Sequence, residues 1–215
     1  MDDLDIFSSV LVWAVPILFA ITVHEVAHGW VASRLGDQTA RRMGRLTLNP
    51  VKHIDPIGTI VLPALLFYLG GFIFGWAKPV PVNWQNLGHP RRDMALVAAA
   101  GPGANLLMMI LWALLAKLIL MLQLPPGWLR DVTAIMCMLG IRFNIILMVL
   151  NLLPLLPLDG GRILTSLLPP DLAAMYSRLE RYGLLILIAL IATGLLGKVL
   201  WPSIKALEQV IYHFL

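Results

Sequence analysis

The amino-acid sequence predicts an all-α polytopic membrane protein, and three observations lead to this fold class. Hydrophobic residues account for 59% of the 215 residues and charged residues for only 13%, a composition that excludes an ordinary soluble domain. Four segments are apolar over roughly the 20 residues that a helix needs to cross a bilayer. Short loops between them hold most of the charge. We therefore expect about four full transmembrane helices, a re-entrant hairpin and short extended segments in a single membrane domain over residues 1–215.

The first predicted helix covers residues 6–35 and carries the motif His24-Glu25-Val26-Ala27-His28 in its second half. Histidines four residues apart leave one face of a helix and can bind the same metal ion. Glu25 is placed to take a proton from a metal-activated water rather than to bind the metal. Ionisable residues in a membrane-buried helix are costly and usually functional. The pattern therefore favours a catalytic metal site over two core histidines with accidental spacing.

Basic loops predict the orientation of the chain in the membrane. Residues 34–55 include five basic and two acidic residues, and residues 75–92 include three basic residues and no acid. The positive-inside rule places both loops in the cytoplasm and the N-terminus outside, so the motif lies on the cytoplasmic side of the membrane. Because both of its flanks are cytoplasmic, the apolar segment of residues 57–74 is predicted to enter and leave by one face. A full span is the alternative.

Charge and cysteine content exclude two further classes. The net charge of +4 is small and lies in loops, so it indicates topology and not a nucleic-acid partner. Cys137 is the single cysteine, which excludes a disulfide framework and a thiolate zinc site. The expected surroundings of the chain are the lipid bilayer.

The second basic loop contains a stretch that is not expected to be helical. Each of Pro79 and Pro81 disfavours helical backbone in the residue before it. Residues 77–82 are therefore predicted to be extended, with a plain loop as the alternative.

Three further helices are predicted after the loops. They cover residues 94–122, 131–153 and 183–200, and an amphipathic tail follows over residues 202–215. The second of these helices leads into a stretch with two prolines and two glycines, which unwinds it at its cytoplasmic end. The functional core is expected within residues 6–168.

A catalytic zinc site has three protein ligands and an open position for water, so a third ligand is needed. The candidates are His53, Asp55, His89 and Asp159. The first three lie in basic loops near the membrane surface, whereas Asp159 ends a span that reaches the depth of the histidine motif. A metal would neutralise a carboxylate that is otherwise costly in this apolar stretch. Asp159 is therefore favoured, and the alternative is a carboxylate that binds backbone amides in its own Asp-Gly-Gly turn.

Three motifs together resemble the site-2 protease family of intramembrane zinc metalloproteases. They are His24-Glu25-x-x-His28, Gly101-Pro102-x-x-Asn105 and Asn151-x-x-Pro154-x-x-x-Leu158-Asp159-Gly160. The first and third motifs are specific in combination, whereas the second alone is weak. Residues 48–55 and 75–82 also resemble segments of the compact bacterial and archaeal members, and the resemblance extends over residues 6–168.

The resemblance implies one Zn²⁺ per chain, bound by His24, His28 and Asp159, with Glu25 as the catalytic base. It implies transmembrane or signal-peptide-like protein substrates in a prokaryotic plasma membrane, cut during regulated intramembrane proteolysis or clearance of signal-peptide remnants. Many members carry a helix before the histidine motif and PDZ or CBS domains. We expect neither in this chain.

Four further residues are candidates for binding substrate. Asn105 and Asn151 are polar groups in apolar helices, so they either hold the substrate backbone or make interhelical hydrogen bonds. Val80 and Val82 lie in the predicted extended stretch, which offers an edge for pairing with an unwound substrate.

A non-enzymatic metal-binding scaffold or carrier is the alternative function. Transport would favour several intramembrane carboxylates along a path, and only Glu25 and Asp159 lie at the required depth. Glu25 would have no role in a protein that only binds metal. The sequence therefore favours peptide-bond hydrolysis.

Overall fold

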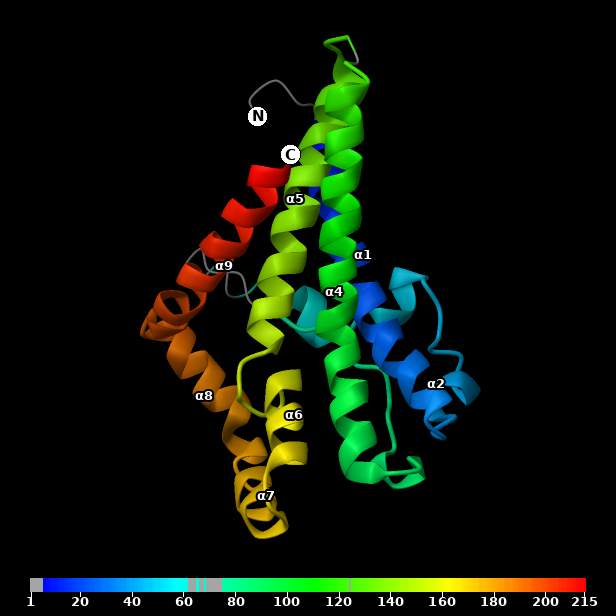
Figure 1. Ribbon diagram of the computed structural model, residues 1–215, viewed down its shortest axis with the longest axis vertical. Helices are drawn as coiled ribbons and strands as arrows, with labels where there is room; N and C mark the ends of the chain where they lie inside the picture. Colours follow the sequence, from blue (N-terminus) through cyan, green and yellow to red (C-terminus); the bar gives the residue numbers. More distant parts are fainter. Residues whose placement is uncertain (1–5, 62–64, 66–67, 69–74, 124) are drawn as a thin grey trace.

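The structure is a computed structural model that describes residues 6–61, 65, 68, 75–123 and 125–215. Three long helices lie side by side along its long axis, and shorter helices cover one end and one flank (Figure 1). Within the described residues the regular elements are all helices, in this order: α1 (Ile6–Arg34), α2 (Thr39–Arg42), η1 (Pro50–His53), η2 (Pro56–Val61), η3 (Trp84–Asn86), α4 (Pro90–Met121), α5 (Trp128–Asn151), α6 (Asp159–Leu167), α7 (Pro170–Ser177), α8 (Glu180–Ala192) and α9 (Leu195–Phe214).

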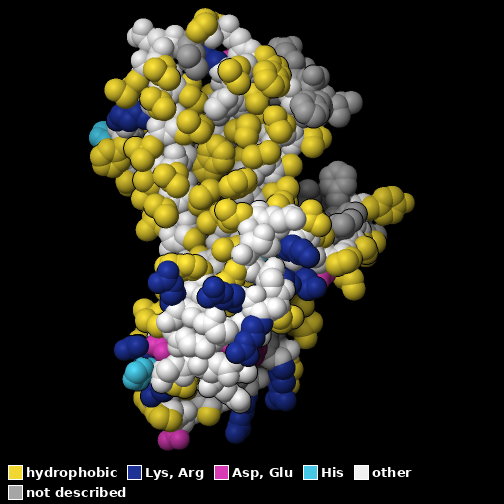
Figure 2. Space-filling view, turned by 90° about the vertical axis from the view of Figure 1, so that its right-hand side faces the viewer, with side chains coloured by type: hydrophobic (Ala, Val, Ile, Leu, Met, Phe, Trp, Pro, Cys, Tyr) yellow, Lys and Arg dark blue, Asp and Glu magenta, His cyan; other side chains and the backbone are white. Residues whose placement is uncertain are grey.

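The three long helices α1, α4 and α5 are each long and apolar enough to cross a membrane. Their outer faces are apolar as well, since α4 exposes leucines 107, 111, 114 and 118. Figure 2 shows hydrophobic side chains over the upper part of the molecule and most Lys and Arg side chains over the lower part. A lipid-facing surface of this kind confirms the predicted all-α polytopic membrane fold.

The last span differs from the predicted one, which covers residues 183–200 and is followed by a separate amphipathic tail over residues 202–215. α8 and α9 are bent by 80° at a short break, and the pair together forms a fourth candidate span. Gly194 in the break has a φ of +69°, a left-handed conformation that residues with a β-carbon rarely adopt. α9 runs on through Pro202, and its Leu200 and Ile204 pack against Ile141 of α5.

Asp37 joins the two basic loops at one end of the helices. Its Oδ2 accepts a hydrogen bond from the backbone N–H of Asn83 at 2.7 Å, and its Oδ1 accepts one from Nδ2 of Asn86 at 2.9 Å. The Gly88 N–H also donates to the carbonyl of Leu35 at 3.1 Å. The two loops therefore lie at the same end of the molecule, as the predicted topology requires.

Most of the predicted re-entrant segment, residues 57–74, lies outside the described residues. Its two flanks are described, and they meet. The N–H of Trp76 donates to the carbonyl of Gly58 at 3.0 Å, and Oγ1 of Thr59 donates to the carbonyl of Trp76 at 2.8 Å. The chain thus leaves and returns at one place, an arrangement compatible with entry and exit by one face of the membrane.

Candidate metal centre

Helices α1 and α6 bring three predicted metal ligands together. His24 and His28 of α1 have their Nε2 atoms 3.0 Å apart. Asp159, the first residue of α6, has Oδ2 at 3.3 Å from Nε2 of His24 and Oδ1 at 3.4 Å from Nε2 of His28. One potential ligand atom from each of the three residues lies within 4.8 Å of those of the other two. Among the described residues, this is the group that could hold a metal ion.

The chain between α5 and α6 places Asp159 at this point. Pro154 and Pro157 prevent α5 from continuing beyond Asn151. The chain turns back, and α6 starts at Asp159, where the free N–H groups of the first turn favour a carboxylate. A β-carbon on Gly160 would overlap the carbonyl of Leu152, so glycine allows α6 to begin directly on the preceding loop.

Hydrogen bonds to Nδ1 fix the tautomers of both histidines. Nδ1 of His28 lies 2.7 Å from the carbonyl oxygen of Val97, which can only accept, so Nδ1 carries the proton. Nδ1 of His24 lies 2.6 Å from Oδ1 of Asn105. The orientation of that amide is set by its Nδ2, which donates to the carbonyl of Ala20 at 3.2 Å. In its neutral form each ring therefore presents an unprotonated Nε2 to the site.

The contacts among the three side chains fit a bound cation. With both rings neutral, the two Nε2 atoms and the carboxylate oxygens are all acceptors, so they repel one another at these distances without a positive charge between them. Oδ2 of Asp159 is buried and has no hydrogen-bond donor among the described residues, although Nε2 of His24 lies close by. Two imidazole nitrogens and one carboxylate form a ligand set that suits Zn²⁺ and leaves a fourth position open.

Gly101 of α4 provides the space that the imidazoles occupy. A β-carbon at this position would lie 2.5 Å from Cε1 of His24 and would overlap Nε2 of His28. α4 can therefore approach α1 this closely only with glycine at this point. The Gly101-Pro102-x-x-Asn105 motif thus has two physical roles, to admit the two rings and to orient one of them.

The structure places Asn105 differently from the predicted substrate-binding role. Its side chain is fully buried, and its Oδ1 and Nδ2 are used by His24 and Ala20. Nδ2 also donates to Oδ1 of Asn144 at 2.9 Å, and Nδ2 of Asn144 donates to the carbonyl of Gly140 at 2.8 Å. Asn105 is therefore a positioning residue for His24, and the interhelical alternative describes it correctly.

Glu25 lies beside the ligand group and is held by the extended segment. Its Oε2 accepts a hydrogen bond from the backbone N–H of Val80 at 2.8 Å. Residues 77–82 contain neither helix nor turn, which fits both the predicted extended stretch and the plain-loop alternative. Nη2 of Arg45, which is buried, donates to the carbonyl of Lys78 at 2.9 Å and so fixes the segment that reaches Glu25.

A cavity of about 460 Å³ opens beside the three ligands. Glu25, Asn151, Val80 and Val82 line it, so the structure brings three of the four predicted substrate-binding residues to the site. Nδ2 of Asn151 donates to a carbonyl of its own helix at 3.0 Å. The full lining consists of His24, Glu25, His28, Trp76, Ala77, Pro79, Val80, Val82, Trp84, Val97, Ala98, Asn151, Pro157, Leu158, Asp159 and Arg162.

The other candidates for a third ligand make local hydrogen bonds instead. Nε2 of His53 lies 3.0 Å from the carbonyl of Thr47. Oδ1 of Asp55 accepts from the N–H groups that begin η2, and the N–H of His89 donates to Oδ2 of Asp93. None of the three lines the cavity.

The roles of Asn144 and Arg45 could not be inferred from the sequence. A polar amide in an apolar helix was the available signal for Asn144. Arg45 contributed only to the charge of its loop, because nothing in the local sequence distinguishes a buried arginine from a loop arginine.

Comparison with known proteins identifies several zinc metalloproteases as relatives. The protein called "Putative zinc metalloprotease YwhC" of Bacillus subtilis is 39% identical over 196 residues, which cover 89% of this chain and 85% of that one. A protein called "Putative zinc metalloprotease Rip2" of Mycolicibacterium smegmatis is 32% identical over 186 residues, and its namesake of Mycobacterium tuberculosis is 31% identical over 173 residues.

The two Rip2 matches cover 84% and 80% of this chain but only 66% and 63% of the Rip2 proteins themselves. No protein-family model matches the chain, and no solved structure matches it significantly. The similarity to YwhC extends over most of both sequences. The chain therefore belongs to the family of zinc metalloproteases that includes YwhC.

Proposed function

We propose that this membrane metalloprotease hydrolyses peptide bonds within or beside transmembrane segments of other membrane proteins, as a site-2 protease does. The location of the ligand group carries the proposal. His24 and His28 lie on a helix that is long and apolar enough to cross a membrane, and Asn105 and Asn144 anchor that group to the two neighbouring membrane helices. A substrate that reaches such a site comes from the bilayer or its edge.

Zinc held by His24, His28 and Asp159 would supply a Lewis acid that lowers the pKa of water to about 7. The general base is Glu25. Because the Val80 N–H holds Oε2, the other carboxylate oxygen, which has no hydrogen-bond partner among the described residues, is the one that takes a proton from the attacking water. Glu25 then delivers this proton to the leaving nitrogen of the cleaved peptide bond.

The extended segment supports a mode of substrate binding. A transmembrane helix hides its peptide bonds, so it must unwind locally before it can be cut. The N–H groups of Lys78 and Val80 are already used by the carbonyl of His53 and by Glu25. Pro79 and Pro81 have no N–H, and their edge offers only carbonyls. The carbonyl of Pro79 on that edge already accepts a hydrogen bond from Nη2 of Arg45 at 3.3 Å. An unwound substrate would therefore pair with the opposite edge, through the carbonyl of Val80 and the N–H of Val82, and extend the segment as a neighbouring strand.

The proposed substrates are transmembrane or signal-peptide-like segments, cut for regulated proteolysis or for clearance of signal-peptide remnants. The proposed location is a prokaryotic plasma membrane, with the N-terminus outside and the site toward the cytoplasm. Support comes from the end of the molecule where the two basic loops meet, because positively charged loops stay in the cytoplasm. The site lies toward that end of α1.

The test uses purified protein in lipid vesicles and a transmembrane peptide with a central Asn-Pro. We expect about one zinc per chain and cleavage that a chelator abolishes and zinc restores. Glu25→Gln keeps the zinc and loses the cleavage. Zinc uptake into the vesicles without any peptide cleavage would instead identify a carrier.

A further inference from the structure

Arg162 places a positive charge in the wall of the cavity that contains the metal ligands. It follows Asp159 by three residues on α6, and side chains at that spacing share one face of a helix. Its Cζ lies 5.2 Å from the ring centroid of Trp84. Both side chains line the cavity. The indole thus supports the flat face of the guanidinium, whose N–H donors point outward in its own plane.

The ion-pair partner of Arg162 among the described residues is Glu180, the first residue of α8. Nη2 of Arg162 donates to Oε1 of Glu180 at 2.8 Å. The side chain of Glu180 is 42% exposed and that of Arg162 is 25% exposed, so water competes with the pair and the pair contributes little to stability. Another carboxylate can therefore replace Glu180, or join it at the remaining donors of the guanidinium.

The other charged groups of the cavity wall have fixed tasks. Asp159 belongs to the ligand group, and Glu25 is bound by the Val80 N–H. Among the described residues of the lining, Arg162 is the one Lys or Arg. It is therefore the wall residue that can distinguish an acidic substrate side chain from a neutral one.

We propose that Arg162 is a specificity-determining residue that binds the carboxylate of an Asp or Glu side chain near the cleaved bond of the substrate. Trp84 orients the guanidinium, and Glu180 occupies it when no substrate is bound. This inference rests on the proposed protease function. It adds a preference for membrane segments with an acidic residue within a few positions of the cut.

The experiment compares pairs of transmembrane peptides that contain a central Asn-Pro and differ only in Glu or Gln at one position within four residues of the cut. For the best position, we expect wild-type protein to prefer Glu about tenfold in kcat/KM, mainly through KM, because a charge-assisted hydrogen bond is lost with Gln. Arg162→Gln brings the ratio to about one, and Arg162→Lys keeps part of it. Glu180→Gln raises the ratio, because it removes the internal competitor.

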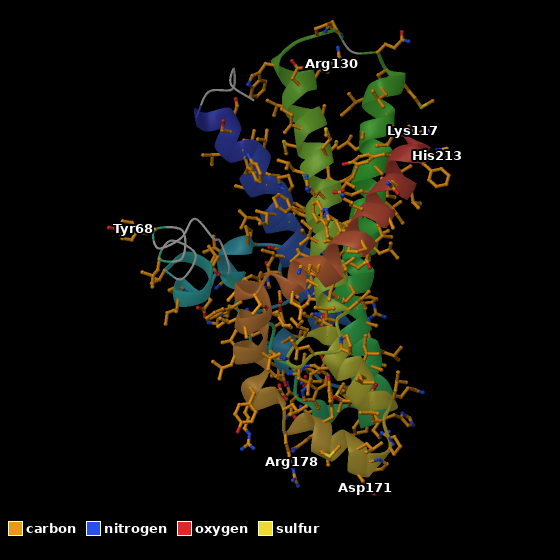
Figure 3. The ribbon with its side chains drawn as sticks, turned by 90° about the vertical axis from the view of Figure 1, so that its left-hand side faces the viewer. Tyr68, Lys117, Arg130, Asp171, Arg178 and His213 are labelled. Carbon is orange, nitrogen blue, oxygen red and sulfur yellow. The ribbon has the colours of Figure 1, made fainter. Side chains whose placement is uncertain are left out.

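Arg178→Gln is the matched control. It removes one positive charge from the same end of the molecule, where Figure 3 shows the side chain pointing away from the helices, and it should keep the wild-type ratio. Zinc content checks that the Arg162 variants retain the site. The Kd of both peptides for the Glu25→Gln protein, with and without Arg162→Gln, gives a readout that does not depend on turnover.

The outcomes separate the two proposals. If wild-type and Arg162→Gln proteins cleave the peptides with the same Glu-to-Gln ratio of kcat/KM, the proposed role of Arg162 is wrong. The same holds if Arg162→Gln keeps a preference for Glu. The protease function is unaffected by either result. If no peptide is cut, the protease proposal fails. The Kd values then decide the role of Arg162. The role is supported if the Glu peptide binds more tightly than the Gln peptide only when Arg162 is present, and it is excluded otherwise.

Discussion

Oδ1 of Asn105 lies 2.6 Å from Nδ1 of His24, and this contact turns the other nitrogen of the ring toward Asp159. The amide can do this because two further contacts hold it, to the carbonyl of Ala20 and to Oδ1 of Asn144. The histidine ligand is therefore oriented by a chain of hydrogen bonds across three membrane helices. Partners of this kind adjust metal affinity without touching the metal.

Replacing Asn105 by Ala should lower zinc affinity by about 10- to 100-fold, because His24 loses the acceptor that fixes its tautomer and ring orientation. The measurement is competition between the purified protein and a chelator of known affinity. Asn151→Ala is the control, since Asn151 lines the cavity but, among the described residues, its side chain bonds to its own helix alone. Equal zinc affinities for the two variants would contradict the positioning role of Asn105.

Gly101→Ala should remove most of the bound zinc, because the added methyl group would overlap the ring of His28 and lie 2.5 Å from Cε1 of His24. Gly103→Ala is a matched control on the same helix, since no heavy atom of the described residues lies within 4 Å of a β-carbon at that position. Zinc content and helicity by circular dichroism would be measured for both. A Gly101→Ala protein with normal zinc content would show that α4 can move away from α1 at no cost.

The histidine motif could be predicted from the sequence because it depends only on helical spacing. Asp159 could be predicted because a carboxylate in an apolar, proline-broken stretch calls for a partner. The role of Asn105 could not, since it acts on a residue 81 positions away and depends on how α1 and α4 pack. The same limit applies to the N–H of Val80, which reaches Glu25 across 55 positions.

The helices themselves were largely predictable, because long apolar segments leave few alternatives in a membrane. Their ends and breaks were less so. α4 begins at Pro90 and α5 at Trp128, slightly before the predicted starts. The break at Gly194 was missed because a single glycine is tolerated in an apolar helix, and only the packing of α9 on α5 decides whether it bends the chain.

Glu25→Gln should keep zinc and lose activity by at least about 100-fold, the usual contribution of a general base. Asp159→Ala should lose both zinc and activity, because two histidines alone leave the ligand set incomplete. Zinc content and cleavage of a transmembrane peptide would be measured in parallel. Full activity of Glu25→Gln would refute the assignment of the base, and unchanged zinc affinity of Asp159→Ala would move the third ligand elsewhere.

Asp37→Asn should destabilise the contact between the two basic loops by about 1–3 kcal/mol. The substitution replaces a buried, charged carboxylate that accepts several hydrogen bonds by a neutral amide, and the bonds to it become weaker. Burial raises the pKa of Asp37, but hydrogen bonds from Thr39, Asn86 and the N–H of Asn83 outweigh it and hold the pKa below its usual 3.8. A lowered pKa stabilises the fold above pH 3.8, and this contribution is lost as the pH falls further.

The pH dependence of this effect can be measured as the rate of proteolysis of the loop around residues 83–86. Wild-type protein should become more susceptible as the pH falls toward 3, and Asp37→Asn should already be susceptible at pH 7 and change less. Asp171→Asn, at an exposed position of the same end of the molecule (Figure 3), should behave as wild type. Identical curves for all three proteins would exclude Asp37 as the residue that joins the loops.

Proline substitutions at Val80 and Val82 separate the two tasks of the extended segment. Val80→Pro removes the N–H that holds Oε2 of Glu25, so it should lower cleavage of short soluble peptides and of transmembrane substrates alike. Val82→Pro leaves Glu25 untouched and removes an N–H that has no partner among the described residues. It should therefore lower only the cleavage of transmembrane substrates, which need the strand edge to stay unwound.

The comparison depends on substrates with different unwinding costs. A transmembrane peptide with a central Asn-Pro should be cut faster than an uninterrupted poly-Leu helix, because proline and asparagine weaken the helix that has to open. Val82→Pro should widen this difference, since the less easily unwound substrate depends more on pairing with the segment. Zinc content should stay at the wild-type level in both proline variants. If Val82→Pro cuts every substrate as wild type does, or if poly-Leu is cut as readily as the Asn-Pro peptide, the segment does not hold an unwound substrate and its role is confined to positioning Glu25.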